Sequence, residues 1–195
     1  MLTAADGNIS YRVSDQEIHI TPSGRPKAMI SAADMATITI DNKILNGSPS
    51  SERLMHLEVY KKAEKAKCVI HAHPPTAIAW SIAHPELDAL PSEALSEVIL
   101  ATGKIPFVPY ALPGTESMGT NLHPFLPHTR NMILSRHGAL SWGESFEEAY
   151  NGMERIENSA QILKAAWELG GITSLSASEI KKLYELRKEI GEKTL

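Results

Sequence analysis

The stretch Cys68-Val69-Ile70-His71-Ala72-His73-Pro74-Pro75 decides how the chain is interpreted. Its first three residues form an apolar run that is too short for a helix and rich in β-forming residues, so they predict a buried strand. Residues two apart in a strand point to the same face, so His71 and His73 can offer imidazole nitrogens to one point in space. The same spacing also fits one histidine satisfied in the core and one exposed histidine.

A third histidine follows a second apolar run of the same kind. Residues 131–135 read Asn-Met-Ile-Leu-Ser, which again predicts a buried strand, and Arg136-His137-Gly138 comes directly after them. His137 can therefore supply a third nitrogen at the distance of about 2.0–2.1 Å that zinc prefers. Three histidines with one open coordination position are typical of a catalytic rather than a structural metal site.

Glu52 lies near the start of a helix predicted over residues 51–64, where hydroxyl residues precede a helical spacing of apolar ones. Its carboxylate has two interpretations. It can cap the helix, favoured by the helix dipole. Alternatively, it can face the metal as an acid/base group while Ser50, Ser51 and the backbone N–H groups of this helix start hold a phosphate.

The rest of the chain alternates short β-like runs with helical periodicity. Strands are predicted over residues 8–13, 17–21, 35–40 and 106–110, and helices over residues 76–83, 92–101, 145–170 and 176–190. Gly7-Asn8 and Ser23-Gly24 fit turns, or small residues that let an anion approach closely. No repeat, linker or break in composition divides residues 1–195, which indicates a single domain.

Composition limits the function classes. The 195 residues are 43% hydrophobic and 22% charged, as in an ordinary globular protein, and the net charge of −4 offers no broad positive field for nucleic acid or an anionic membrane. No apolar stretch approaches the roughly 20 residues that span a bilayer. The lone Cys68 cannot form an internal disulfide, and no signal peptide opens the chain, so we expect a cytoplasmic protein.

Five short motifs occur together in a fixed order: Gly7-Asn8-Ile9-Ser10, Ile20-Thr21-Pro22-Ser23-Gly24, Pro49-Ser50-Ser51-Glu52, His71-Ala72-His73 and Arg136-His137-Gly138. As a set they resemble the class II aldolase/adducin family, and most closely its L-fuculose-phosphate aldolase-like branch. The resemblance runs from Asp6 to about Ala166. It implies an α/β chain with a three-layer α/β/α architecture and a mainly antiparallel central sheet.

The resemblance also implies roles for individual residues. His71, His73 and His137 match the zinc ligands, one ion per chain, although manganese or cobalt suits the same ligands. Glu52 matches the catalytic carboxylate. The phosphate-binding positions of the family match Asn8, Ser23, Gly24, Ser50 and Ser51.

The implied activity is that of a metal-dependent aldehyde-lyase: reversible retro-aldol cleavage of a ketose 1-phosphate, such as L-fuculose 1-phosphate, to dihydroxyacetone phosphate and an aldehyde. Glu52 favours an aldolase over a phosphosugar 4-epimerase, which usually has Asp there. A sugar-acid phosphate decarboxylase, a dehydratase and a non-catalytic adducin-like domain are the other interpretations. The family's tyrosine proton donor is replaced here by Leu95, with Glu93 and Ser96 the nearest candidates for its role.

The resemblance further implies a homotetramer with sites at subunit interfaces and a small phosphorylated sugar as the binding partner. The residues offer one hint of their own. The helix over residues 145–170 carries many apolar residues, and Trp142 and Tyr150 are expected to be exposed aromatic residues. Such apolar surface is consistent with contacts between copies of the chain.

Overall fold

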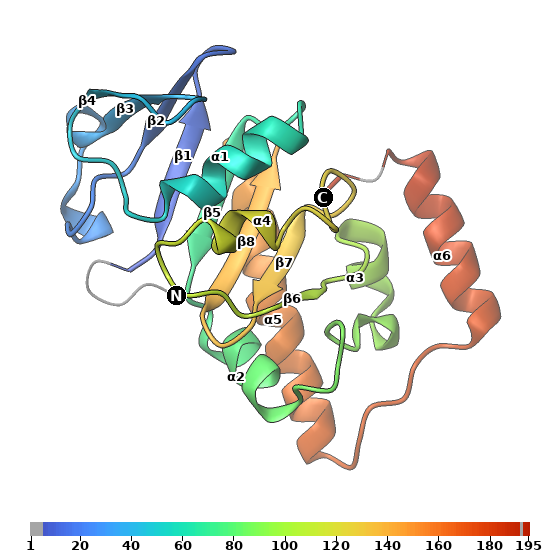
Figure 1. Ribbon diagram of the computed structural model, residues 1–195. Helices are drawn as coiled ribbons and strands as arrows, with labels where there is room; N and C mark the ends of the chain where they lie inside the picture. Colours follow the sequence, from blue (N-terminus) through green and yellow to red (C-terminus); the bar gives the residue numbers. More distant parts are fainter. Residues whose placement is uncertain (1–5, 192) are drawn as a thin grey trace.

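The computed structural model describes residues 6–191 and 193–195, and its centre is an eight-stranded sheet with the order β4-β3-β2-β1-β5-β8-β7-β6 (Figure 1). All neighbouring strands pair antiparallel except β6 and β7. The strands are β1 (Asn8–Arg12), β2 (Glu17–Ile20), β3 (Ala36–Thr39), β4 (Ile44–Asn46), β5 (Cys68–Ala72), β6 (Phe107–Val108), β7 (Asn131–Leu134) and β8 (Gly138–Gly143).

Helices cover both faces of the sheet. One face carries α1 (Arg53–Lys62) and the short α4 (Ser117–Thr120), which pack on each other. The opposite face carries α2 (Pro75–Ala83), α3 (Ser96–Ala101) and the long α5 (Phe146–Glu168), and α6 (Ala177–Glu189) packs on α3 at the edge of the molecule (Figure 1). Within the described part of the chain, no helix has the length and apolar character needed to cross a membrane.

The alternation of β5 explains the two apolar cores. All five residues of this strand are buried, because a strand in the middle of a sheet is covered on both faces. Val69 packs in the core beneath α1, whereas Cys68 and Ile70 pack in the core beneath α5. His71 has the parity of Val69, so its side chain points to the face that carries α1.

The structure confirms the three-layer architecture with a mainly antiparallel sheet, and it differs from the sequence prediction in several elements and in one side chain. Gly138–Gly143 is the strand β8, and Ile44–Asn46 is the edge strand β4, although neither was predicted. The expectation that Trp142 is exposed is wrong. Its side chain is 2% exposed, because it packs under the Arg130 guanidinium at 4.6 Å and donates its indole N–H to the Thr129 carbonyl. Tyr150 is 44% exposed, as expected.

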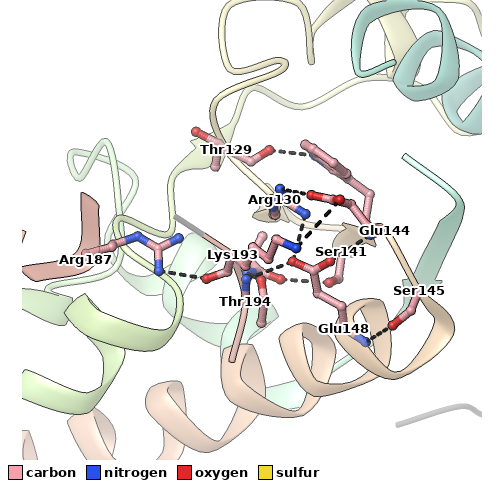
Figure 2. Close-up of polar contacts among 11 residues, drawn as sticks. Thr129, Arg130, Ser141, Glu144, Ser145, Glu148, Arg187, Lys193 and Thr194 are labelled. Atoms are coloured by element: carbon pink, nitrogen blue, oxygen red, sulfur yellow. Dashed lines mark hydrogen bonds and ion pairs between the residues drawn. The ribbon is translucent and has the colours of Figure 1, made fainter. Parts of the chain in front are cut away.

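The last described residues return to the sheet and enter a buried polar cluster (Figure 2). The Thr194 N–H donates to Oε1 of Glu148, which also accepts from Arg130 at 2.7 Å. The Thr194 hydroxyl accepts from the Asn131 amide at 2.8 Å, and the Asn131 oxygen accepts in turn from Ser141. These bonds fasten the end of the chain to β7, β8 and the first turn of α5.

Candidate active site

The three predicted histidines lie together at one end of the central strands. His71 is on β5, His73 follows that strand, and His137 lies in the turn between β7 and β8. One ring nitrogen from each lies within 4.8 Å of the other two, and the ring centroids are 4.9–5.1 Å apart. The strand spacing and the hairpin turn thus bring together side chains that are far apart in sequence.

The geometry and protonation of these histidines fit a divalent metal ion. The Nε2 atoms of His71 and His73 are 3.1 Å apart, close to the roughly 3.3 Å between two tetrahedral ligands at zinc–nitrogen distances. His71 donates its Nδ1–H to the Ala139 carbonyl at 2.9 Å, which leaves the Nε2 lone pair for a metal. Burial lowers the pKa of His71 to about 4, so the ring is neutral at pH 7. This ligand set does not choose among zinc, manganese and cobalt.

The turn that carries His137 depends on the backbone conformation of Arg136 and on the absence of a side chain at Gly138. Arg136 has a φ of 61°, a left-handed conformation that is uncommon for a residue with a side chain, and its N–H is held by the Ser81 hydroxyl at 2.8 Å. A Cβ on Gly138 would lie 2.6 Å from the Ala72 carbonyl oxygen and 2.7 Å from Cε1 of His71. The absence of a side chain at Gly138 therefore allows the hairpin to approach the histidines.

Glu52 points into this cluster rather than capping its helix. It stands at the N-cap position of α1, but its side chain makes no capping hydrogen bond. Its Oε1 lies 3.2 Å from Nε2 of His137, and its Oε2 lies 3.4 Å from Nε2 of His71 and accepts from the Asn8 amide at 2.7 Å. Burial alone would raise the pKa of Glu52, but the hydrogen bonds from His137 and from the Asn8 amide lower it to about 2. The carboxylate is ionised at neutral pH.

A cavity of about 410 Å³ opens beside Glu52, His73 and His137. All five residues to which the family resemblance assigns phosphate binding line it: Asn8, Ser23, Gly24, Ser50 and Ser51. Gly24 has a φ of 69°, which glycine adopts without strain. The candidate metal ligands, the carboxylate and the small polar residues therefore share one polar cavity.

Sequence reasoning missed Lys27 and Asp6, which also line this cavity. Lys27 begins a 3-10 turn directly after the turn at residues 22–26. Its closeness in sequence to Ser23 was the signal that could have identified it as a residue of the site. Burial lowers the pKa of Lys27, while the carboxylates of Asp6 and Glu52 act in the opposite direction. Asp6 also lies 3.5 Å from Nδ1 of His73. Lys27 gives the cavity a positive charge that suits an anionic substrate.

The segment around Leu95, where the family resemblance places a tyrosine proton donor, supplies no proton donor to this cavity. Leu95 packs against the apolar core beneath α5, and the described residues that line the cavity include neither it nor its neighbours Glu93 and Ser96. A proton donor from this segment is therefore not part of the site within the chain that the structure describes.

A larger hollow of about 600 Å³ lies along α5, around Asn151 and Asn158. Among the described residues, the one cluster with three ligand atoms close enough for a metal is the histidine triad, which lies in the smaller cavity. Chemistry rather than size therefore places the candidate active site beside His73, His137 and Glu52.

Comparisons with known proteins find relatives that match most of the chain. A 3-oxo-tetronate 4-phosphate decarboxylase from Escherichia coli O6:H1 is 31% identical over 189 residues, which cover 93% of this chain and 86% of the relative. An L-fuculose phosphate aldolase from Methanococcus maripaludis is 30% identical over 161 residues, covering 83% and 85%. The crystal structure of L-fuculose-1-phosphate aldolase from Thermus thermophilus superposes with a TM-score of 0.75 at 30% identity, covering 88% of this chain and 89% of that one.

The family comparison covers most of the sequence. The profile of the family described as "Class II Aldolase and Adducin N-terminal domain" matches residues 1–163, which include β1 to β8 and most of α5. The matched region contains Glu52, the histidine triad and the whole lining of the cavity. With this match, the fold and the two relatives, the chain belongs to the class II aldolase/adducin family.

Proposed function

We propose that the chain is a metal-dependent lyase that cleaves a carbon–carbon bond in a small phosphorylated sugar. The favoured reaction is the retro-aldol cleavage of a ketose 1-phosphate to dihydroxyacetone phosphate and an aldehyde. The observation that carries the proposal is the position of Glu52, whose ionised carboxylate faces His71 and His137 and also borders the cavity lined by Ser50 and Ser51.

In this proposal the phosphate is held away from the reacting carbons. The hydroxyls of Ser23, Ser50 and Ser51 and the ammonium of Lys27 offer donors to the phosphate oxygens, and Gly24 lets the backbone approach them. Binding at this remote group fixes the position of the carbonyl and the adjacent carbon relative to Glu52. The phosphate thus contributes orientation as well as affinity.

A divalent metal bound by His71, His73 and His137 would supply a Lewis acid that stabilises the negative charge developing on the substrate oxygens. In the condensation direction, ionised Glu52 accepts a proton from the hydroxymethyl carbon of dihydroxyacetone phosphate. The electron pair of that C–H bond forms the new bond to the aldehyde carbon, and the aldehyde oxygen takes a proton from water. Cleavage is the reverse, with Glu52 returning the proton to the same carbon.

A decarboxylase is the second candidate, favoured by the relative that acts on 3-oxo-tetronate 4-phosphate. That substrate has the same order of groups as a ketose 1-phosphate: a phosphorylated carbon, a carbonyl and a hydroxyl-bearing carbon. Loss of carbon dioxide leaves an electron pair on the hydroxyl-bearing carbon, and protonation there by a group placed like Glu52 gives dihydroxyacetone phosphate. The two reactions therefore share the three-carbon product and differ in the fragment that leaves.

The deciding experiment measures the leaving fragment. Metal-loaded protein is incubated with a panel of ketose 1-phosphates and with 3-oxo-tetronate 4-phosphate, while dihydroxyacetone phosphate, aldehyde and carbon dioxide are each quantified. Aldehyde in equal amount with dihydroxyacetone phosphate supports the aldolase, and carbon dioxide in equal amount supports the decarboxylase. A ketose phosphate inverted at one carbon supports an epimerase. A chain that cannot be loaded with metal and converts no substrate supports an adducin-like interaction domain.

A further inference from the structure

A buried line of polar side chains runs between β1 and α1 and ends at Glu52. The Tyr60 hydroxyl lies 2.8 Å from the Ser10 hydroxyl, which lies 2.7 Å from Nδ1 of His56. Nε2 of His56 lies 2.5 Å from Oδ1 of Asn8, whose amide nitrogen donates to Glu52 at 2.7 Å. Exposure is 0% at Ser10 and His56, 2% at Tyr60 and 3% at Asn8, so the line is buried and meets the cavity at its Asn8–Glu52 end.

Secondary structure explains why these side chains meet. Glu52, His56 and Tyr60 are four residues apart, so the turns of α1 place them on one side of the helix. Asn8 and Ser10 are two apart on β1 and point to the same face of the sheet. The line is therefore built into the packing of α1 against β1.

The hydrogen bonds along this line can have only one donor-to-acceptor direction. An ionised carboxylate accepts hydrogen bonds and donates none, so Asn8 must turn its NH₂ group to Glu52 and its oxygen to His56. That oxygen needs a donor, so His56 carries its proton on Nε2 and leaves Nδ1 as an acceptor.

The remaining two hydroxyls complete the same order. Ser10 donates its single proton to Nδ1 of His56, so its oxygen accepts from the Tyr60 hydroxyl. The other acceptor near the Tyr60 hydroxyl, the Lys67 carbonyl, is 3.5 Å away, beyond the usual range for this bond. Burial lowers the pKa of His56 to about 3, so the ring is neutral, as this order requires.

We infer that His56 is a positioning residue: its Nε2–H fixes the orientation of the Asn8 amide, and that amide fixes the Glu52 carboxylate between the histidine triad and the cavity. The inference rests on the proposed function for its effect on turnover. His56 does not line the cavity, and its ring nitrogens hydrogen-bond to Asn8 and Ser10, so it acts on Glu52 through Asn8. If the Asn8 amide turned over, its carbonyl oxygen would face Glu52 and repel the carboxylate from its present place.

A matched pair of variants separates positioning from simple packing. His56→Gln places an amide N–H near the position of Nε2 and can still donate to Asn8, whereas His56→Asn reaches only the position of Nδ1 and cannot. We expect His56→Asn to lower kcat about a hundredfold, as a displaced catalytic group does, with little change in KM. His56→Gln is expected to keep at least roughly a tenth of the wild-type kcat. Equal kcat values in two variants of equal unfolding free energy would overturn the inference.

The tautomer of His56 gives a second test that needs no activity. In metal-free protein with ¹⁵N-labelled histidine, two-bond proton–nitrogen correlations show which ring nitrogen carries the proton, and the signals that vanish in His56→Gln assign the residue. We expect a proton on Nε2. A proton on Nδ1 would overturn the inference, because Asn8 would then have to turn its NH₂ group away from Glu52.

Ser10→Ala changes the line on the β1 side of His56 and leaves the sequence of α1 unchanged. It removes the donor to Nδ1, so we expect the Nδ1–H tautomer to become detectable and kcat to fall by less than in His56→Asn. A tautomer and a kcat like those of the wild type would count against the inference. If wild-type protein has the proton on Nε2 but converts no sugar phosphate, the proposed lyase fails and the role of His56 in turnover fails with it, while the orientation of Asn8 stands.

Discussion

The Oε1 atom of Glu52 lies 3.2 Å from the Nε2 atom of His137. This contact connects the N-cap of α1 to the hairpin between β7 and β8. A carboxylate at this distance from a candidate ligand is close enough to reach the metal position itself. It must nevertheless stay free to accept a proton, because an acid/base group that is fully coordinated cannot act on substrate. Substrate binding is therefore expected to separate Glu52 from the metal position.

Metal content should depend on the triad. The purified protein is expected to hold about one divalent ion per chain, and His71→Ala or His73→Ala should remove most of it, because two remaining ligands bind far more weakly. Elemental analysis after dialysis measures the ratio. His123→Ala is the control, since His123 pairs with Glu58 on α1 away from the cavity. Full occupancy in the His71/His73 double variant would refute the site.

Glu52→Gln should retain metal and phosphate binding but turn over roughly 10²–10⁴ times more slowly, the span of a positioned acid/base group. The side chain makes no capping hydrogen bond, so only a small change in the unfolding free energy is expected. Steady-state kinetics and denaturant unfolding measure the two effects. Unchanged turnover would show that Glu52 is not the acid/base group.

Lys27→Ala should weaken substrate binding. Loss of a charge-assisted contact to the phosphate is expected to raise KM about tenfold, or about 1.4 kcal/mol, with little change in kcat. Lys43→Ala removes the same charge from an exposed position outside the cavity and should leave KM unchanged. Equal KM values for the two variants would show that Lys27 does not contact the substrate.

Gly138→Ala should damage the triad by crowding it. The new Cβ would meet the Ala72 carbonyl and the His71 ring, so metal affinity is expected to fall about ten- to a hundredfold. Gly143→Ala is a matched control on the same strand, because its Cβ would press on Glu148, 2.7 Å away, and not on a histidine. Both variants should lose about 1–3 kcal/mol of unfolding free energy. Only Gly138→Ala should lose metal, and calorimetric titration would test this.

The protein is expected to be a homotetramer whose sites lie between neighbouring subunits. Phe146 and Tyr150 are each 44% exposed and stack at 5.9 Å on the surface of α5, so apolar area is available for contacts between copies. Sedimentation velocity combined with activity at the same concentrations tests the assembly. A fully active monomer would contradict the expectation, because the pocket would then be complete in one chain.

The positions of the triad could be predicted because they follow from short-range rules. His71 and His73 share a face through the period of a strand, and the apolar run before His137 indicated a second strand. Strand β8 could not be found in this way. Its sequence begins and ends with glycine and contains no β-branched residue, so it resembles a turn, and its structure depends on pairing with β5 and β7.

Other parts of the site depend on contacts between distant elements, which sequence spacing does not reveal. His56 lies within an ordinary helical run, and only the approach of β1 supplies Ser10 and Asn8 as its partners. Lys27 follows a turn whose direction sets whether its ammonium reaches the cavity or the solvent. Edge strand β4 is exposed along its whole length, so it has no alternating pattern to detect.

The strand order also determines how the protein should lose activity on heating. Asn8 and His71 lie on β1 and β5, with β2, β3 and β4 outside one of these strands and β8, β7 and β6 outside the other. Local opening begins at edges and termini, so fraying of β4 or β6 leaves these two strands paired. The backbone amides of the inner strands should therefore exchange with deuterium only through global unfolding, and heat inactivation should coincide with the cooperative loss of the whole fold.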